Sequence, residues 1–307
     1  MRFFSFVLLV GLLAAAACKP KGKLLLDTPT FDAYQSERTK SLVQNRGKGG
    51  GVTFKVLETK PSKMIDYEWF DSNKLVLPAM AYHHGAVVAP LKKMKTQVDW
   101  SKYRAETINK KSAALAHVIE QENVALLIYG NPPNELKVIT DTWGLVIRDM
   151  KTQEVKHTID FSNYCQAPEF TFRDKDFVWQ DLLWAQVEDN ILYFSTAHWT
   201  YAESTKGKNA YISALDLTTK TLLWRSEPLR CNATNFEIKG NHIFTGYGFT
   251  MENAMIYALH KIDGTDAGKI ELRPKNSDKK FIEYLIFKDG KLHVHCHDKS
   301  YILQVNQ

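Results

Sequence analysis

The feature that most constrains the fold of this chain is a repeat of about fifty residues. Its first unit is an apolar residue, a polar turn and then a strand of alternating apolar residues. Copies span residues 70–75, 187–192, 238–243 and 287–292, with a weaker copy around Asn123. The turns fall at Asn73, Asn123, Asn190, Asn241 and Gly290, and one interval is lengthened by an insertion at 165–177. Each unit predicts two antiparallel strands.

A second unit follows each first one and also predicts a hairpin with a polar turn. Its clearest copy is 212–224, further copies span 145–155 and 256–272, and 94–100 is a fragment. Each period therefore holds four strands, which is typical of a β-propeller blade. We predict an all-β fold, a β-propeller of five blades or six. Residues 52–57 supply the strand that the last blade lacks and close the ring, which removes an exposed sheet edge.

The second unit also carries a family resemblance. The run Ala214-Leu215-Asp216-Leu217, followed by Leu223-Trp224-Arg225, resembles the repeat of quinoprotein-type (PQQ-like) propellers across residues 119–307. Some members of that family are quinone-dependent dehydrogenases. Others are lipoproteins that serve the assembly of outer-membrane β-barrels and bind no cofactor. The resemblance implies a propeller fold, and the chain looks more like the lipoprotein members.

The N-terminus has the order of an export signal. Arg2 is followed by the apolar run 3–13, four alanines and Cys18. The run is too short to span about 30 Å of hydrocarbon as a resident helix. A cysteine after small residues resembles a bacterial lipobox, in which Cys18 is lipidated; plain secretion and an uncleaved anchor are the alternatives. We predict a signal peptide over 1–17, a flexible lipidated tether over 18–50 and a propeller over 51–307.

Composition narrows the location and the partners. The chain has 307 residues with a net charge of +6, and the charges of both signs are interleaved, so nucleic-acid binding is not indicated. Lys19 follows the proposed lipidated cysteine, where an aspartate is the commonest inner-membrane retention signal. We therefore predict a lipid-anchored protein of the outer membrane that faces the periplasm.

Two equivalent loops carry the candidate binding residues. His198, Trp199 and Tyr201 lie in one of them, and Tyr247 and Phe249 lie in its counterpart in the next repeat. Aromatic side chains in loops offer a large, rigid contact area for a partner. The alternative is that they fill the space between blades.

Cysteines and histidines offer two further candidates. Cys165 and Cys231 occupy equivalent linkers between blades, where they form a disulfide or remain two free thiols. His293, His295 and His297 alternate along the expected final strand and share one side of it. A straight strand separates them by about 7 Å, so we expect solvated histidines and no metal site. Cys296 then faces a packing layer.

These features favour a non-enzymatic scaffold of the cell envelope that binds an unidentified envelope protein or a saccharide. The chain has no Gly-x-Ser-x-Gly or His-Glu-x-x-His motif and no phosphate-binding glycine loop, and we expect no cofactor. The alternative is a periplasmic sensor of a small ligand, or a quinone-linked dehydrogenase, that uses the propeller funnel.

Overall fold

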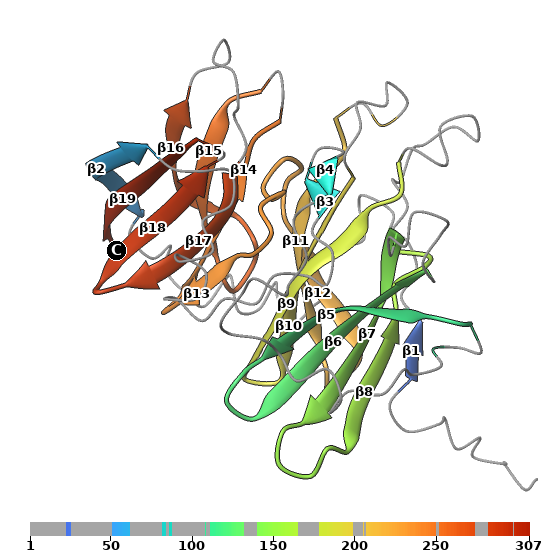
Figure 1. Cartoon of the computed structure of the whole chain (residues 1–307). Helices are drawn as coiled ribbons and strands as arrows, with labels where there is room; N and C mark the ends of the chain where they lie inside the picture. Colours follow the sequence, from blue (N-terminus) through green and yellow to red (C-terminus); the bar gives the residue numbers. More distant parts are fainter. Residues whose placement is uncertain are drawn as a thin grey trace, which may run out of the picture.

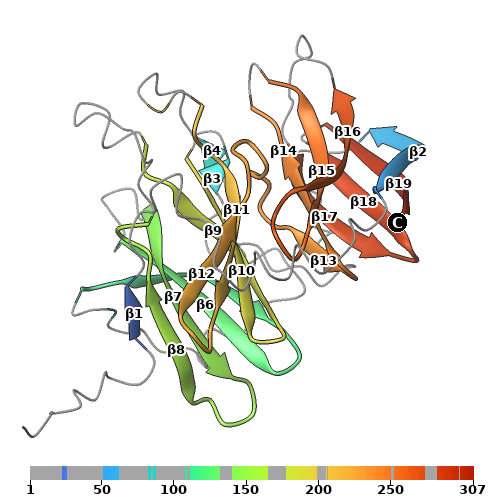
Figure 2. The same ribbon diagram turned by 180° about the vertical axis from the view of Figure 1, so that it is seen from behind.

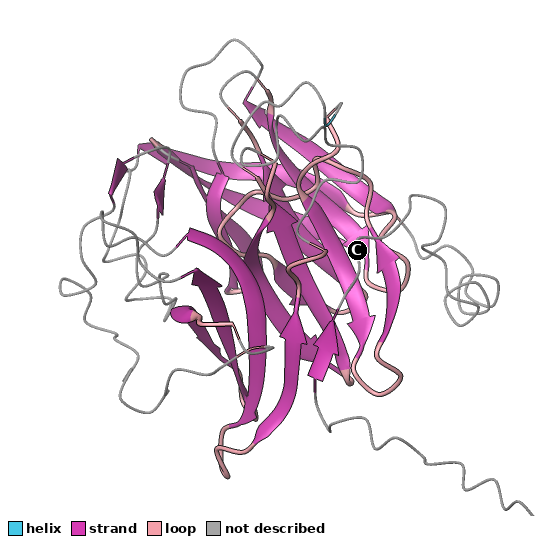
Figure 3. Cartoon of the chain, turned by 90° about the vertical axis from the view of Figure 1, so that its right-hand side faces the viewer, coloured by secondary structure: helices cyan, strands magenta, loops and turns pink. Residues whose placement is uncertain are grey.

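A computed structural model describes residues 23–25, 51–61, 82–83, 86–87, 108, 111–131, 140–164, 178–198, 205, 207–249, 252–273, 282–296 and 298–307. Strands account for almost all of its regular structure (Figure 3). The first ten are β1 (Lys23–Leu25), β2 (Thr53–Pro61), β3 (Tyr82–His83), β4 (Ala86–Val87), β5 (Ala114–Glu120), β6 (Val124–Asn131), β7 (Thr140–Asp149), β8 (Val155–Asp160), β9 (Asp181–Glu188) and β10 (Ile191–Ala197). The others are β11 (Tyr211–Asp216), β12 (Thr221–Arg225), β13 (Glu237–Lys239), β14 (His242–Tyr247), β15 (Ala254–His260), β16 (Asp266–Arg273), β17 (Ile282–Lys288), β18 (Lys291–Cys296) and β19 (Lys299–Asn306). Within these ranges no helix is long and apolar enough to cross a membrane.

Apart from β1 and the two-stranded β3–β4 sheet, the strands form four propeller blades, each with four antiparallel strands (Figure 1). Blade 1 is β5–β8, blade 2 is β9–β12, blade 3 is β13–β16, and blade 4 is β17–β19 completed by β2. The strands follow chain order in blades 1 to 3, whereas in blade 4 the N-terminal β2 lies beside β19; β5, β9, β13 and β17 are the first strands. The first strand of one blade packs on its neighbour, as β9 does on β7 and β17 on β14. The protein is therefore an all-β propeller.

The blade number differs from the expected five or six. The described part of the chain forms four blades, and the expected first repeat, around Asn73, lies outside it. Residues 53–61, which precede that repeat, are the fourth strand of the last blade and do not open a blade of their own. The prediction of five or six is thus wrong for these residues.

The predicted pairing of the N-terminal strand with the last blade is confirmed, and closure of the ring stays a prediction. β2 pairs antiparallel with β19 along its length, from Thr53 opposite Asn306 to Pro61 opposite Lys299. Just before β2, the Val52 N–H donates to the Ala267 carbonyl of blade 3 at 2.8 Å. The predicted strand 52–57 was placed correctly but is longer than expected. Pairing of distant chain segments in one blade covers the edge of β19 that would otherwise be exposed.

The sequence of the turns explains the first hairpin of two blades. Asp189 and Asn190 join β9 to β10 with φ of 51° and 63°, and Asp289 and Gly290 join β17 to β18 with φ of 51° and 75°. Two residues with positive φ make the type I′ turn, whose twist matches that of the strands it joins. Asparagine, aspartate and glycine tolerate this conformation best, so these turn predictions are confirmed.

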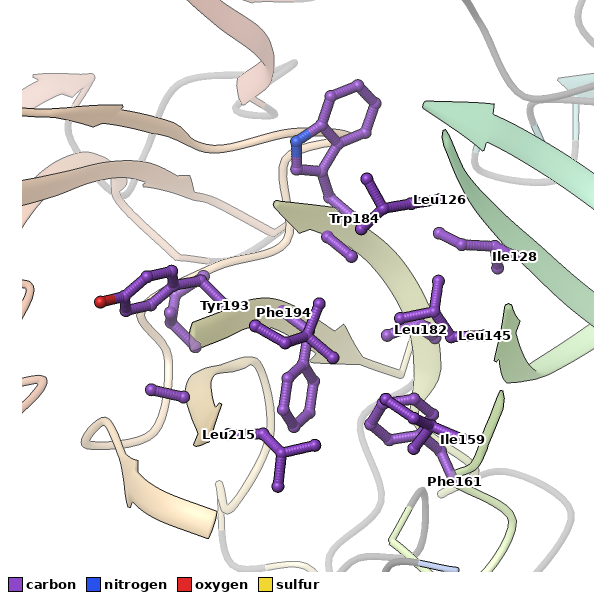
Figure 4. Packing of buried hydrophobic residues seen from close by; sticks show 14 of the residues in the cluster. Leu126, Ile128, Leu145, Ile159, Phe161, Leu182, Trp184, Tyr193, Phe194 and Leu215 are labelled. Carbon is purple, nitrogen blue, oxygen red and sulfur yellow. The ribbon is translucent and has the colours of Figure 1, made fainter. Parts of the chain in front are cut away.

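The core lies between the faces of neighbouring blades. Leu126, Leu145 and Ile159 of blade 1 face Leu182 and Phe194 of blade 2 (Figure 4). These side chains are at most 2% exposed. A second apolar cluster joins blades 3 and 4. Apolar runs such as Leu126–Tyr129 supply strands that are buried on both faces. Close packing of these side chains against the next blade fixes the angle between the blades.

The expected tether contains one unexpected element. β1 pairs in parallel with β8, the outermost strand of blade 1, with Lys23 opposite Thr158, Leu24 opposite Ile159 and Leu25 opposite Asp160. Figure 2 shows this short strand beside β8. The segment 18–50 is therefore not a free linker throughout, because three of its residues extend a blade.

Candidate functional site

The candidate site lies on the side of the propeller that carries the links between blades. Each blade has tight turns after its first and third strands, and these lie at one side. The connection after each second strand and the link to the next blade lie at the other, which we call the loop side (Figure 1). The candidate residues His198, Tyr247 and Phe249 follow or end second strands, so they belong to the loop side.

Asparagine side chains hold the start of these loops. The His198 N–H donates to Asn209 Oδ1 at 2.8 Å, and Asn209 Nδ2 donates back to the His198 carbonyl at 2.9 Å. The side-chain amide thus takes the place of a partner strand and satisfies both backbone groups of one residue. A buried backbone group without a partner is costly, so this paired bond fixes where the β10–β11 loop leaves the blade.

The same arrangement recurs twice in the link between blades 2 and 3. Asn232 Nδ2 donates to the Gly248 carbonyl at 2.7 Å, and the Gly248 N–H donates to Asn232 Oδ1 at 3.0 Å. Asn235 Nδ2 donates to the Leu285 carbonyl at 2.7 Å, and the Leu285 N–H donates to Asn235 Oδ1 at 2.9 Å. We call Asn209, Asn232 and Asn235 the asparagine clamps. Asn232 and Asn235 join the link to blades 3 and 4, whereas Asn209 holds the β10–β11 loop within blade 2. Together they make the loop side a rigid platform.

The clamps occupy related places in the two loops. His198 is the residue directly after β10, and Gly248 is the residue directly after β14. The two loops that carry the candidate residues are therefore fixed at the same point of each blade. Backbone preorganisation of this kind lowers the entropy that a binding surface loses when it meets a partner.

The candidate side chains divide into buried and half-buried ones. His198 is 4% exposed and Tyr247 is 5% exposed, and the Tyr247 hydroxyl donates to Glu252. This burial fits the alternative in which the loop aromatics fill the space between blades. Phe249 is half-buried and keeps part of its ring at the surface. Trp199 and Tyr201 lie outside the described residues.

Cys231 is buried and has no disulfide partner among the described residues. Its Sγ donates to the Tyr211 carbonyl at 2.9 Å, and burial raises its pKa far above the usual range. A thiol in this state reacts slowly. Cys165 lies outside the described residues, as does Cys18, so the disulfide and the lipidation stay predictions.

An acidic group that the sequence did not single out lies at the junction of blades 1 and 2. Asp181 begins β9, and its Oδ1 accepts the Thr142 N–H at 2.8 Å. Burial is the main cause that raises the pKa of Asp181 to about 7, and the neighbouring Asp141 adds to the shift. Acids with perturbed pKa values often mark functional surfaces, although structural networks produce them too.

The strand histidines are not uniformly solvated as expected. His293 is partly exposed, but His295 is fully buried, stacks on Tyr284 with ring centroids 4.5 Å apart and lies 3.0 Å from Ser300 Oγ. The expectation that His295 is solvated was wrong, because side chains cover both faces of β18 at this position. Cys296 is buried, as predicted, and His297 lies outside the described residues. Among the described residues no group of three metal-binding side chains occurs.

Comparison with known proteins gives likenesses to solved structures at low sequence identity. No protein-family model matches the chain, and no curated protein matches it. BamB from Moraxella catarrhalis is similar at 12% identity and a TM-score of 0.36, over 72% of this chain and 64% of that one. Sqt1 from Saccharomyces cerevisiae is similar at 9% identity and a TM-score of 0.42, over 68% of this chain and 50% of that one.

The β-propeller domain of the Trilobed protease from Pyrococcus furiosus is similar at 13% identity and a TM-score of 0.34, over 59% of this chain and 48% of that one. The matched region thus spans less than two thirds of each of these three proteins. The propeller assignment rests on the strand pairing of this chain.

Proposed function

We propose that this protein is a non-enzymatic binding scaffold of the cell envelope, anchored by a lipid on Cys18 and facing the periplasm from the outer membrane. Its loop side binds an envelope protein or a saccharide. The observation that carries the proposal is the pair of clamps Asn209 and Asn232, which hold the β10–β11 and β14–β15 loops at matched positions. A rigid platform with loops of variable sequence is the usual design of a binding surface.

Phe249 is the described aromatic side chain best placed to make the contact. It directly follows Gly248, whose N–H and carbonyl are both held by Asn232, and its ring is half-buried. A large side chain on a fixed backbone loses little entropy on binding. His198 and Tyr247 are buried at the start of the β10–β11 and β14–β15 loops and do not offer their side chains to a partner. We assign Trp199 and Tyr201 to the same surface from their place in the sequence.

A pair of matched variants tests the proposed face. Phe249→Ala removes a half-buried ring on the loop side, and Phe287→Ala removes a half-buried ring at the end of β17, on the opposite side. The full-length protein is used to capture partners from envelope extracts after melting of each variant has been checked. Capture of the same partner should fall several-fold with Phe249→Ala and stay unchanged with Phe287→Ala. Loss with Phe287→Ala alone would contradict the proposed face.

The lipid anchor has a separate test. Cells that express the protein are fed a radioactive fatty acid, and label should appear on the parent but not on a Cys18→Ala variant. The variant should also leave the membrane fraction, because one lipid-modified N-terminus is the proposed link to the bilayer. Label that persists in Cys18→Ala would refute the anchor.

A further inference from the structure

We infer that β1 holds the lipid anchor beside the β7–β8 turn, so that blade 1 meets the membrane with its turns while the loop side points away from it. The inference rests on the proposed lipidation of Cys18. It adds the orientation of the propeller on the bilayer and the kind of surface, a lipid headgroup layer, that the turn end of blade 1 faces.

The direction of β1 carries the first step. β8 runs from the β7–β8 turn at Val155 to the loop side at Asp160. β1 is parallel to it, with Lys23 opposite Thr158 and Leu25 opposite Asp160. The N-terminal end of β1, at Lys23, is therefore its end nearer the β7–β8 turn. Cys18 belongs to the stretch that precedes Lys23.

The length of the connection carries the second step. Cys18 precedes Lys23 by five residues, which span at most about 18 Å when fully extended. Without β1 the first fixed point would be β2, thirty-five residues from Cys18, and the extended chain would reach about 120 Å. Pairing of β1 with β8 therefore converts a long tether into a short one. A short tether restricts which part of the protein can touch the bilayer.

The charges near the anchor suit a headgroup layer. Lys19, Lys21 and Lys23 alternate through the short connection, and basic residues beside a lipid anchor are attracted to anionic lipids. In the β7–β8 turn, Asp149 is neutralised by an ion pair with Lys156 at 2.7 Å. Glu154 and Lys151 in that turn carry opposite charges, so the turn does not oppose the attraction.

Two exposed positions at opposite ends of β8 provide the probes. Thr152 lies in the β7–β8 turn, and Asn163 lies beyond the loop end of β8. The full-length lipidated protein, carrying Thr152→Cys or Asn163→Cys and a thiol-reactive fluorophore, is reconstituted into vesicles of phosphatidylethanolamine and phosphatidylglycerol with a headgroup spin label. The labelled parent gives the background from native thiols. Quenching should be at least threefold stronger at residue 152 than at residue 163.

A variant of β1 links this difference to the strand. Successive residues of a strand point their N–H groups to opposite sides, so Leu24→Pro together with Leu25→Pro removes one that faces β8. This variant should make the two probes equally quenched. A control with Gln44→Pro and Asn45→Pro, downstream of β1, should keep the difference.

A cross-link checks the pairing itself. Lys23→Cys with Thr158→Cys should form a disulfide on mild oxidation, since the two residues are register partners. Lys23→Cys with Thr221→Cys, on the outer strand of blade 2, should not. Mass spectrometry of the linked peptides separates these bonds from any that involve native cysteines.

The outcomes separate the inference from the proposed function. Equal quenching of both probes in vesicle-bound parent protein would overturn the orientation while leaving the lipid anchor in place. Stronger quenching at residue 163 than at residue 152 would likewise overturn the orientation and leave the lipid anchor in place. Failure of the parent to float with the vesicles would overturn the lipid anchor and the orientation that rests on it.

Discussion

Asn232 and Gly248 exchange two hydrogen bonds although sixteen residues separate them, with Asn232 Nδ2 donating to the Gly248 carbonyl at 2.7 Å and the Gly248 N–H donating to Asn232 Oδ1 at 3.0 Å. The bonds tie the link between blades 2 and 3 to the loop that carries Phe249. Asn209 and Asn235 form the same paired contact with other backbone segments. The loop side is thus held by side chains where no strand is available.

Removal of this clamp should destabilise the protein. Asn232→Ala leaves the N–H and carbonyl of Gly248 without their partner, and each buried group left unsatisfied costs about 1–3 kcal/mol. We expect the free energy of unfolding to fall by about 2–4 kcal/mol in urea denaturation. Asn253→Ala, which removes a contact with Glu271 at the surface, is the control and should change it by less than about 1 kcal/mol. Equal losses of unfolding free energy in Asn232→Ala and Asn253→Ala would show that the clamp stabilises the protein no more than a surface contact does.

The close approach of β16 to the segment just before β2 can be tested by substitution of Gly268. A Cβ on Gly268 of β16 would collide with the Val52 carbonyl just before β2. Since backbone cannot move aside as a flexible side chain can, Gly268→Ala should destabilise by about 1–3 kcal/mol and lower the melting temperature. At Gly51 a Cβ would lie 3.4 Å from the Ala267 carbonyl, an ordinary contact, so Gly51→Ala should melt like the parent. A Gly268→Ala protein as stable as the parent would contradict the close approach of β16 to this segment.

The pKa of Asp181 predicts a pH dependence. Its pKa is about 7 in the folded protein and near 3.8 in the unfolded chain, so the folded state binds more protons between these values. Stability therefore declines as the pH rises from about 4 to about 7. Asp181→Asn cannot ionise and keeps an oxygen that accepts the Thr142 N–H, so its unfolding free energy should decline less over that window. Urea titrations between about pH 4 and pH 7 measure the unfolding free energy of each protein, with Asp189→Asn in an exposed turn as the control. Identical pH profiles for the parent and Asp181→Asn would refute the raised pKa of Asp181.

Because Cys231 and Cys296 are buried, we expect both thiols to react slowly with alkylating reagents in the native protein. Cys231 and Cys296 are both buried, and burial raises the pKa of each, to about 12 for Cys296. Iodoacetamide should leave both unmodified in the native protein and modify both after unfolding in urea under reducing conditions. Mass spectrometry without reduction shows at the same time whether Cys165 and Cys231 form a disulfide or remain two free thiols. Rapid native alkylation of Cys231 would contradict its burial.

The turns and blades could be predicted from the sequence because they depend on local signals. Asp189-Asn190 and Asp289-Gly290 require positive φ, and only a few residues tolerate it, so these turns were found without a structure. Closure by residues 52–57 followed from a missing strand in the last repeat. The described residues form four blades rather than the expected five or six, and the repeat expected around Asn73 lies outside them.

The site depended on contacts that no local pattern reveals. Asn232 lies sixteen residues from Gly248 and Asn235 lies fifty from Leu285, and an asparagine in a linker usually signals only a turn. β1 has three residues and no periodicity of its own, so it was included in a flexible tether. His295 was assigned to solvent because alternation along one strand does not tell whether a second layer covers that side.

The most direct test of the account is photo-crosslinking in intact cells, with a photoreactive phenylalanine analogue at position 249 or at position 287 of the full-length protein. The account predicts a discrete adduct with an envelope component from position 249 on the loop side and none from position 287 on the turn side. Adducts of equal yield from both positions, or from position 287 alone, would contradict the claim that the clamped loop side is the binding face.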